Sequence, residues 1–382
     1  MNPVAPTLLQ IVPALPGGGL ARATIETAQA TIAAGGRAII ASAGGAMVAD
    51  LLRLRGTHID LPATRHPLLA RLSLPQRLAQ AVNNLDVGLI LARTPETAWI
   101  ARALARRIRR PWISVLHAPP RRAGLLDRLL ASRQVAADAV IAVSEFVARD
   151  ARTHVPAVES RLSIVPPGIN LDRFDPAVVR ADRVIRLAAE LRVPEDRRLV
   201  LCPGRFEHDS GQLLLVDAIK RIGRDDIFCL LLGASPAPTP FQRTLERAID
   251  MAGLGGRVQI GPYIDDMPAA YMLADAVVAT GGPAQGFSRT LVEAQAMGRP
   301  VVAEDGGGAA EAIRNGVSGW LSPAGDATAL AGAIDAALSL PADRRAELAR
   351  AAQDHARQRH GLAAHNAALL DLFRRVAAPT PA

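Results

Sequence analysis

The segment QGFSRTLVEAQAMGRPVVA, residues 285–303, carries the most information about the fold of this chain. An apolar run at residues 276–280 precedes it, and a β-branched run at 300–303 closes it. Between these runs lie a glycine-containing loop and a stretch with apolar residues at helical spacing. This order predicts a parallel strand, a crossover helix and a second parallel strand, which is the repeating unit of an α/β sheet.

The loop and the start of this predicted helix are suited to bind an anion. A helix leaves its first backbone N–H groups without partners in the helix, so they are available to a phosphate. Glu293 follows Gln285 by eight positions, about two helical turns, and therefore returns to the same side. Its carboxylate can accept hydrogen bonds from both hydroxyls of a ribose, but in its apolar setting it needs a partner. We assign anion binding to the amides of Gly286, Phe287, Ser288 and Arg289.

The same alternation of apolar runs and helix-length segments fills the rest of the chain. At 382 residues, the chain exceeds the size at which a single core usually stops growing. The sequence therefore predicts an α/β protein with two Rossmann-like, doubly wound domains. The strand candidates are residues 8–13, 37–42, 87–92, 112–117, 139–144 and 162–166 in the first half, and 198–202, 228–233, 258–261, 276–280, 300–303 and 319–321 in the second.

The expected domain boundary is the segment PPGIN at residues 166–170, because paired prolines exclude helix and the glycine permits a change of direction. A polar helix is expected just after it, at 176–191. Ligands of open α/β sheets bind beyond the carboxyl ends of the strands, so the two domains are expected to face each other across a cleft. We expect an N-terminal domain at 1–170, a C-terminal domain at 171–362, and a final helix at 363–382 that packs back on the N-terminal domain.

Composition and charge exclude several classes of protein. Aromatic residues make up only 3% and no nucleic-acid-binding motif is visible, so the formal charge of +8 does not indicate a nucleic-acid partner. Residues 1–165 hold 20 Lys or Arg against 10 Asp or Glu, and the totals of 44 and 36 leave 24 against 26 beyond them. Cys202 and Cys229 lie in apolar runs, where we expect neither a disulfide nor a metal site. The first residues do not have the pattern of a signal peptide, so a cytoplasmic location is expected.

Three further strand ends carry candidate ligand groups, and each has a plainer structural interpretation. The glycine turn at residues 17–19 lets Gly18 and Gly19 approach a phosphate, although its spacing is not that of a dinucleotide or P-loop motif. Arg205 closes the first strand of the second domain, where its guanidinium can hold a diphosphate; otherwise it is an exposed arginine in a turn. His117 ends a strand of the first domain, and a lone histidine is more often a packing residue than a catalytic one.

Taken together, these motifs resemble those of the retaining glycosyltransferase family 4, also called the glycosyl transferases of group 1. Members of that family have the two-domain fold known as GT-B. The resemblance covers nearly the whole chain and rests on the glycine turn, on Gly204-Arg205, and on the segments 142–146, 165–174, 265–271, 293–300 and 319–326.

The resemblance implies transfer of a sugar from a nucleotide-sugar donor, with retention of configuration and without a metal ion or other cofactor. It assigns Arg205 to the diphosphate, Glu293 to the ribose, and residues 286–289 to the donor sugar and phosphate. His117 matches a histidine near the reacting sugar, and Gly18 and Gly19 match a loop over the phosphates. The implied acceptor is a glycan or a lipid-linked glycan, as in the biosynthesis of cell-envelope polysaccharide or lipopolysaccharide.

Two positions depart from the family pattern. Ser210 stands where a lysine usually follows the motif arginine by five residues, and Gln285 replaces the first glutamate of a Glu-x7-Glu motif. One charge that contacts phosphate is therefore missing, and a carboxylate has become an amide that both donates and accepts. An active enzyme with altered donor choice is compatible with these changes. So is a catalytically silent homologue that binds a nucleotide or a glycan as a regulatory or scaffold subunit.

Residues 99–110 combine Ile100, Leu104 and Ile108 with five arginines. This pattern predicts a basic amphipathic helix that contacts an anionic membrane peripherally, at the inner face of the cell membrane. The alternative is a helix that faces the protein core with its arginines in solvent.

Overall fold

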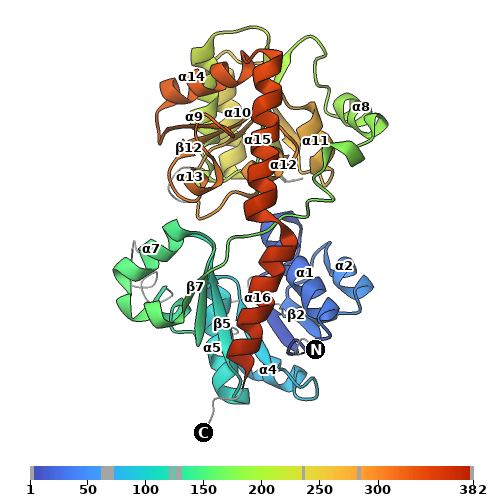
Figure 1. Ribbon diagram of the computed structural model, residues 1–382, viewed down its shortest axis with the longest axis vertical. Coiled ribbons are helices and arrows are strands. Elements are labelled where there is room, and N and C mark those ends of the chain that lie inside the picture. Colours follow the sequence, from blue (N-terminus) through green and yellow to red (C-terminus); the bar gives the residue numbers. More distant parts are fainter. Residues whose placement is uncertain are drawn as a thin grey trace. The chain divides into compact units, whose positions relative to one another are not determined.

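The computed structural model describes residues 4–61, 73–119, 124, 131–234, 237–281 and 285–378, and the chain forms two compact units (Figure 1). Unit 1 comprises Met1–Pro167 and Ala363–Ala382, and unit 2 comprises Gly168–Leu362. Each unit contains a sheet in which all strands pair in parallel, with helices between successive strands. The predicted α/β class with two doubly wound sheets is confirmed.

In the described part of unit 1, seven strands form a sheet in the order β3-β2-β1-β4-β5-β6-β7. The strands are β1 (Leu8–Ile11), β2 (Ala38–Ser42), β3 (Thr57–Asp60), β4 (Leu89–Ala92), β5 (Trp112–Leu116), β6 (Ala139–Ala142) and β7 (Leu162–Ile164). The helices are α1 (Gly18–Ala33), α2 (Val48–Arg53), α4 (Leu74–Ala81), α5 (Pro95–Ile108), α7 (Glu145–His154) and α16 (Leu362–Ala377), with a 3-10 helix at Pro156–Arg161.

In the described part of unit 2, six strands form a sheet in the order β10-β9-β8-β11-β12-β13. The strands are β8 (Arg198–Pro203), β9 (Ile227–Ala234), β10 (Val258–Pro262), β11 (Ala276–Ala279), β12 (Val301–Asp305) and β13 (Trp320–Pro323). The helices are α8 (Ala181–Glu190), α9 (Gln212–Ile222), α10 (Pro240–Met251), α11 (Met267–Leu273), α12 (Arg289–Ala296), α13 (Ala309–Ala312), α14 (Ala327–Leu338) and α15 (Ala342–His360), with 3-10 turns at Pro176–Val178 and His208–Ser210.

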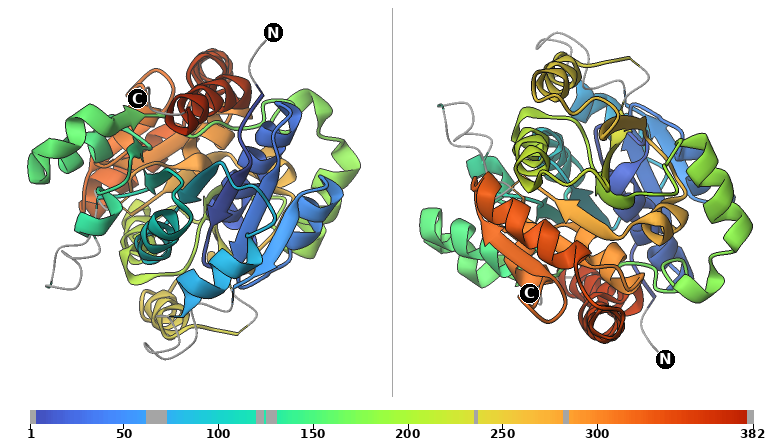
Figure 2. Two further views of the ribbon diagram at one scale, coloured as in Figure 1. Left: turned by 90° about the horizontal axis from the view of Figure 1, so that it is seen from below. Right: turned by 90° about the horizontal axis from the view of Figure 1, so that it is seen from above.

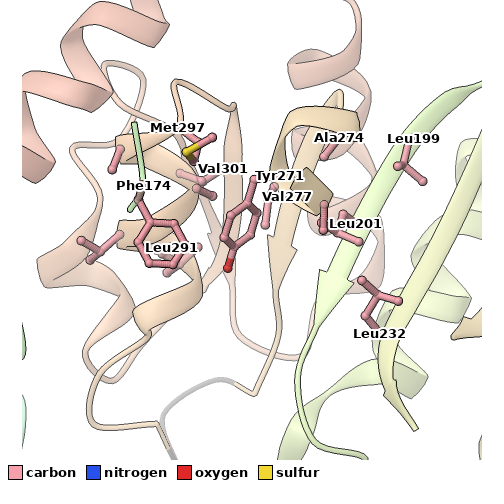
Figure 3. Packing of buried hydrophobic residues seen from close by; sticks show 14 of the residues in the cluster. Phe174, Leu199, Leu201, Leu232, Tyr271, Ala274, Val277, Leu291, Met297 and Val301 are labelled. Carbon is pink, nitrogen blue, oxygen red and sulfur yellow. The ribbon is translucent and has the colours of Figure 1, made fainter. Parts of the chain in front are cut away.

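Two apolar cores cover the two faces of the unit 2 sheet. Successive strand residues point to opposite faces, so Leu199 packs in one core and Val200 in the other. The first core includes residues of α8, α11, α12 and α15, and the second includes residues of α9, α10 and α14. These helices are labelled in Figure 1, and Figure 2 shows the same ribbon from two further directions. Figure 3 shows the first core, where the ring of Tyr271 packs beside Phe174, with ring centroids 6.1 Å apart. This double coverage explains why the strands are apolar without alternation.

Two elements differ from the sequence expectation. Strand β3 was not expected, because it is an edge strand whose residues Thr57–Asp60 are exposed or only partly buried and carry no apolar run. The helix expected at 176–191 is shorter and begins at Ala181, after a 3-10 turn at Pro176–Val178 and an extended Val179.

Helix α5 resolves the two interpretations of its amphipathic pattern. Ile100 and Leu104 are 4% and 0% exposed, so the apolar side belongs to the core of unit 1. Arg106, Arg107, Arg109 and Arg110 are exposed. The apolar side of α5 therefore packs as the core-facing interpretation expects, and peripheral contact of the exposed arginines with a membrane stays a prediction. Within the described ranges, no helix combines the length and the apolar character that crossing a bilayer requires.

Candidate functional site

The turn after β8 brings Arg205 to the carboxyl edge of the unit 2 sheet. The Gly204 N–H donates to the Leu232 carbonyl at 2.9 Å, which fixes the turn against β9. Gly233 has a φ of 138°, and a Cβ there would lie 1.9 Å from the Gly204 oxygen, so this close approach requires glycine. The Arg205 side chain is 85% exposed and meets Glu207 at 3.4 Å. An exposed ion pair of this kind is weak, so the guanidinium is available to an anionic ligand.

Thr280 links the two positions that depart from the family pattern. It follows β11 and is buried, and its hydroxyl donates to the Ser210 carbonyl at 2.7 Å. Its own carbonyl accepts from Gln285 Nε2 at 3.0 Å. The loop after β8 and the loop before α12 are therefore tied to the same residue. The bond requires a hydrogen-bond donor at position 285, which the amide supplies and an ionised carboxylate does not.

The loop before α12 is also held from the side of β12. The Gly308 N–H donates to the main-chain carbonyl of Gln285 at 2.8 Å. A Cβ at Gly308 would lie 2.1 Å from the Gly286 oxygen, so any side chain there would displace the loop. Gly286 and Ser288 are buried, and the partly buried Phe287 packs on the ring of His360 at 5.4 Å between centroids. The predicted anion-binding loop is thus fixed by backbone contacts.

Glu293 lies on α12, is 7% exposed, and has the partner that its apolar setting demands. The Tyr271 hydroxyl donates to its Oε2 at 3.0 Å, and Arg289 Nε approaches Oε1 at 3.4 Å. Burial, and then the negative charge of Glu293, hold the pKa of Tyr271 well above its usual value, so this hydroxyl keeps its proton. Ser288 precedes α12 without a side-chain hydrogen bond to the first turn, so the side chain at that position does not cap the first amides.

An open pocket of about 420 Å³ lies at the same edge of the unit 2 sheet, at the ends of β8, β11, β12 and β13. Glu304 lies in its wall, and its two oxygens accept the amides of Gly281 at 2.8 Å and Gly325 at 2.9 Å. The pocket adjoins the predicted donor residues but is lined by none of them. Its lining residues are His208, Asp209, Gly211, Leu214, Gly281, Glu304, Ala324 and Gly325.

The predicted site residues of unit 1 lie at the carboxyl edge of its own sheet. Helix α1 begins at Gly18, after Gly17, and the φ angles of the two residues are 80° and 130°. A Cβ at Gly18 would meet no atom within 4 Å, so its left-handed backbone is the reason for glycine. Gly19 lies in the first turn of this helix, which has no side-chain cap.

His117 follows β5 and is partly buried, and its Nε2 atom is buried without a hydrogen-bond partner among the described residues. Burial, and then the positive charge of Arg93, lower the pKa of His117 to about 3. The imidazole is therefore neutral at pH 7, with one nitrogen able to donate and the other able to accept a hydrogen bond from a hydroxyl.

Sequence reasoning did not single out Tyr271, Thr280 or Glu304. Tyr271 lies within the motif segment 265–271, but its bond to Glu293 joins residues 22 positions apart. Glu304 had a detectable signal, because a glutamate that closes the apolar run Val301–Ala303 is unusual in a buried strand. Thr280 had none, since its role comes only from the contacts of its carbonyl and hydroxyl.

Two family models match the chain. The model described as glycosyl transferases group 1 matches residues 185–355, and the model described as glycosyltransferase family 4 matches residues 17–173. A curated relative, the D-inositol 3-phosphate glycosyltransferase of Xylanimonas cellulosilytica, is 34% identical over 261 residues, which are 67% of this chain and 61% of that protein. The protein of the same name from Mycobacterium tuberculosis is 32% identical over 223 residues, 58% of this chain and 45% of that protein. The chain thus spans about half to three-fifths of these relatives' length.

Solved structures match over nearly the whole chain. A glycosyltransferase from Rickettsia africae superposes with a TM-score of 0.86 and 26% identity, over 98% of this chain and 100% of that one. The Anabaena protein HepE, in complex with UDP and glucose, gives a TM-score of 0.84 with 23% identity, over 96% and 98% of the two chains, and this likeness concerns the fold. The strand-end motifs of unit 2, the two family models and these shared folds agree: the chain belongs to the group 1 glycosyltransferases and has the GT-B fold.

Proposed function

We propose that this protein transfers a sugar from a nucleotide-sugar donor to a glycan or lipid-linked acceptor with retention of configuration. The observation that carries the proposal is the arrangement of unit 2, where Arg205 follows β8 and the loop to Glu293 follows the neighbouring strand β11. A nucleotide that spans these two strand ends would meet a cation for its diphosphate and a carboxylate for its ribose. The Anabaena neighbour of the same fold binds UDP and UDP-glucose, which supports a nucleotide sugar as donor.

In the proposed reaction, the protein stabilises the charge that develops on the leaving diphosphate. Arg205 exchanges its weak contact with Glu207 for the diphosphate oxygens, and the amides at the start of α12 add fixed dipoles. Positioned donors of this kind act without rearrangement in the transition state. The scheme needs neither a nucleophilic side chain nor a metal ion or other cofactor, because cation and dipoles supply the positive charge.

The acceptor is proposed to bind unit 1, where the basic residues are concentrated. The curated relatives are named as D-inositol 3-phosphate glycosyltransferases. We therefore propose phosphorylated polyols as a third acceptor class, beside glycans and lipid-linked glycans. The proposed location is the cytoplasm, with arginines of α5 available for electrostatic contact with an anionic membrane surface.

A panel of nucleotide sugars, scored for release of nucleoside diphosphate with and without acceptors, tests this proposal. We expect release from at least one donor, with acceleration by an acceptor. If a nucleotide binds but no donor is turned over with any acceptor class, the silent-homologue alternative replaces the enzyme.

A further inference from the structure

Arg93 is a buried cation that the proposed donor chemistry does not use. It follows β4 and is 5% exposed. Its Nε donates to Gln10 Oε1 at 3.0 Å, and its Nη2 donates to Thr27 Oγ1 at 2.6 Å and to the Ala23 carbonyl at 3.3 Å. Gln10 is held in turn, because its Nε2 donates to the Thr24 carbonyl at 2.9 Å. Every acceptor that the described residues offer to the guanidinium is therefore neutral, and each belongs to β1 or α1.

The charge of Arg93 lacks a direct counter-charge. No ion pair joins it to a carboxylate in the ranges that the structure describes, and its Nη1 has no acceptor there. Burial lowers the pKa of Arg93 to about 10, a value that already includes the opposing effect of the negative charge of Glu26. Buried charges are normally paired, because removing an ion from water is costly and neutral acceptors compensate only in part.

The strand register places Arg93 beside a second group that lacks a partner. Gln10 pairs with Leu91 on β4, and Leu91 pairs with Ile113 on β5. Alternate residues share a face, so one face of the sheet carries Gln10, Arg93 and His117. Arg93 is nearer than Gln10 to the carboxyl edge of the sheet, and His117 is nearer still. The buried Nε2 of His117 has no partner among the described residues. Open α/β sheets bind ligands at this edge.

We propose that Arg93 and His117 bind an anionic acceptor, one that carries a phosphate ester or a carboxylate. Arg93 Nη1 holds an oxygen of the anion, and His117 Nε2 hydrogen-bonds a hydroxyl of the same molecule. A hydroxyl both donates and accepts, so either tautomer of the imidazole fits. The term acceptor rests on the proposed glycosyl transfer, whereas anion binding at Arg93 does not.

If Arg93 has only a structural role, its replacement changes stability alone. If Arg93 binds an anion, its replacement also removes the stabilisation that the anion gives. Arg93→Met removes the donor of the buried Gln10 Oε1, so we expect a lower unfolding temperature in anion-free buffer. The comparison that decides is therefore the response of each variant to added anion. Arg161→Met is the matched control in unit 1, because Arg161 also bonds a neutral main-chain oxygen, that of Ala137, at 2.7 Å.

The test is the rise in unfolding temperature with inorganic phosphate, glycerol 3-phosphate or acetate, against glycerol and chloride at equal ionic strength. It is made in an Arg205→Gln background, so that the candidate diphosphate arginine does not contribute. We expect a concentration-dependent rise that Arg161→Met retains and Arg93→Met loses, with affinity weaker by about tenfold or more. A larger response to glycerol 3-phosphate than to inorganic phosphate indicates a phosphate ester, and a response to acetate alone indicates a carboxylate.

The proposal is overturned if none of the anions exceeds chloride, or if Arg93→Met responds like the Arg161→Met control. Should Arg93→Met fail to fold, Arg93→Lys decides, since it keeps the charge but loses the planar fork: a weakened response supports the site, and an unchanged one overturns it. Binding of nucleoside diphosphates by the natural chain is measured separately. The acceptor site and the proposed donor site can therefore fail independently.

Discussion

Glu293 has two tasks in this account, because it accepts the Tyr271 hydroxyl and is proposed to accept ribose hydroxyls. Glu293→Ala is expected to weaken nucleotide binding by about 1.5–3 kcal/mol, through loss of a charged acceptor. It also leaves the buried Tyr271 hydroxyl without that acceptor, so the unfolding temperature falls as well. The control Tyr271→Phe removes the internal bond alone and should leave nucleotide affinity nearly unchanged. Isothermal titration of both variants checks this, and full affinity in Glu293→Ala would remove the ribose assignment.

Gln285 is expected to matter through the hydrogen that its amide donates to Thr280. Gln285→Glu restores the family residue, yet an ionised carboxylate would face the Thr280 carbonyl and loosen the loop before α12. Protonation of the new carboxyl group restores a hydrogen-bond donor. Turnover of the nucleotide sugar, relative to the natural chain, should therefore improve as the pH falls. The bond to Thr280 leaves Oε1 as the group for sugar hydroxyls, so donor-sugar preference should change more than diphosphate affinity. A pH-independent deficit, or an undiminished activity, would contradict this role.

His117 makes stability depend on pH in a defined direction. Its folded pKa of about 3 lies below the ordinary 6.5, so between these values the unfolded chain binds more protons than the folded one. The contribution of the neutral imidazole is complete above pH 6.5 and is lost as the pH falls toward 3. Denaturant titration across this window should show a shallower pH dependence for His117→Gln. The exposed His154→Gln serves as control, and equal slopes in all three proteins would contradict the buried neutral state.

At the scale of elements, only the arginine side of α5 is exposed and able to contact a membrane. Because Ile100 and Leu104 are buried, contact with vesicles should be electrostatic, without insertion. We expect sedimentation with anionic vesicles but not with neutral ones, and release at about 0.5 M salt, where screening is strong. Replacing Arg106, Arg107 and Arg109 by glutamine should reduce it more than replacing Arg243 and Arg247 of α10 together with Arg180. Equal sedimentation with neutral vesicles would remove this idea.

The sequence determined most elements because both faces of each sheet are covered. Strands such as β9 and β11 are continuous apolar runs, which a sequence displays directly. Edge strand β3 is covered less, so its residues Thr57–Asp60 carry no such signal.

Contacts in the candidate site could be predicted from the sequence only where a residue type by itself requires a contact. A buried glutamate implies that a partner exists, but Tyr271 as that partner depends on how α11 packs against α12. Thr280 and Arg93 act through contacts with residues distant in the chain, and those contacts exist only after the sheet has formed.

At the scale of the whole molecule, the central claim is that the carboxyl edge of unit 2 binds the diphosphate of a nucleotide through Arg205. Isothermal titration of UDP and other nucleoside diphosphates into the natural chain, Arg205→Gln and the exposed control Arg180→Gln tests it most directly. The account predicts that at least one nucleotide binds the natural chain and the control alike, and binds Arg205→Gln about tenfold or more weakly. Absence of binding to any nucleotide, or equal affinity in all three proteins, would contradict it.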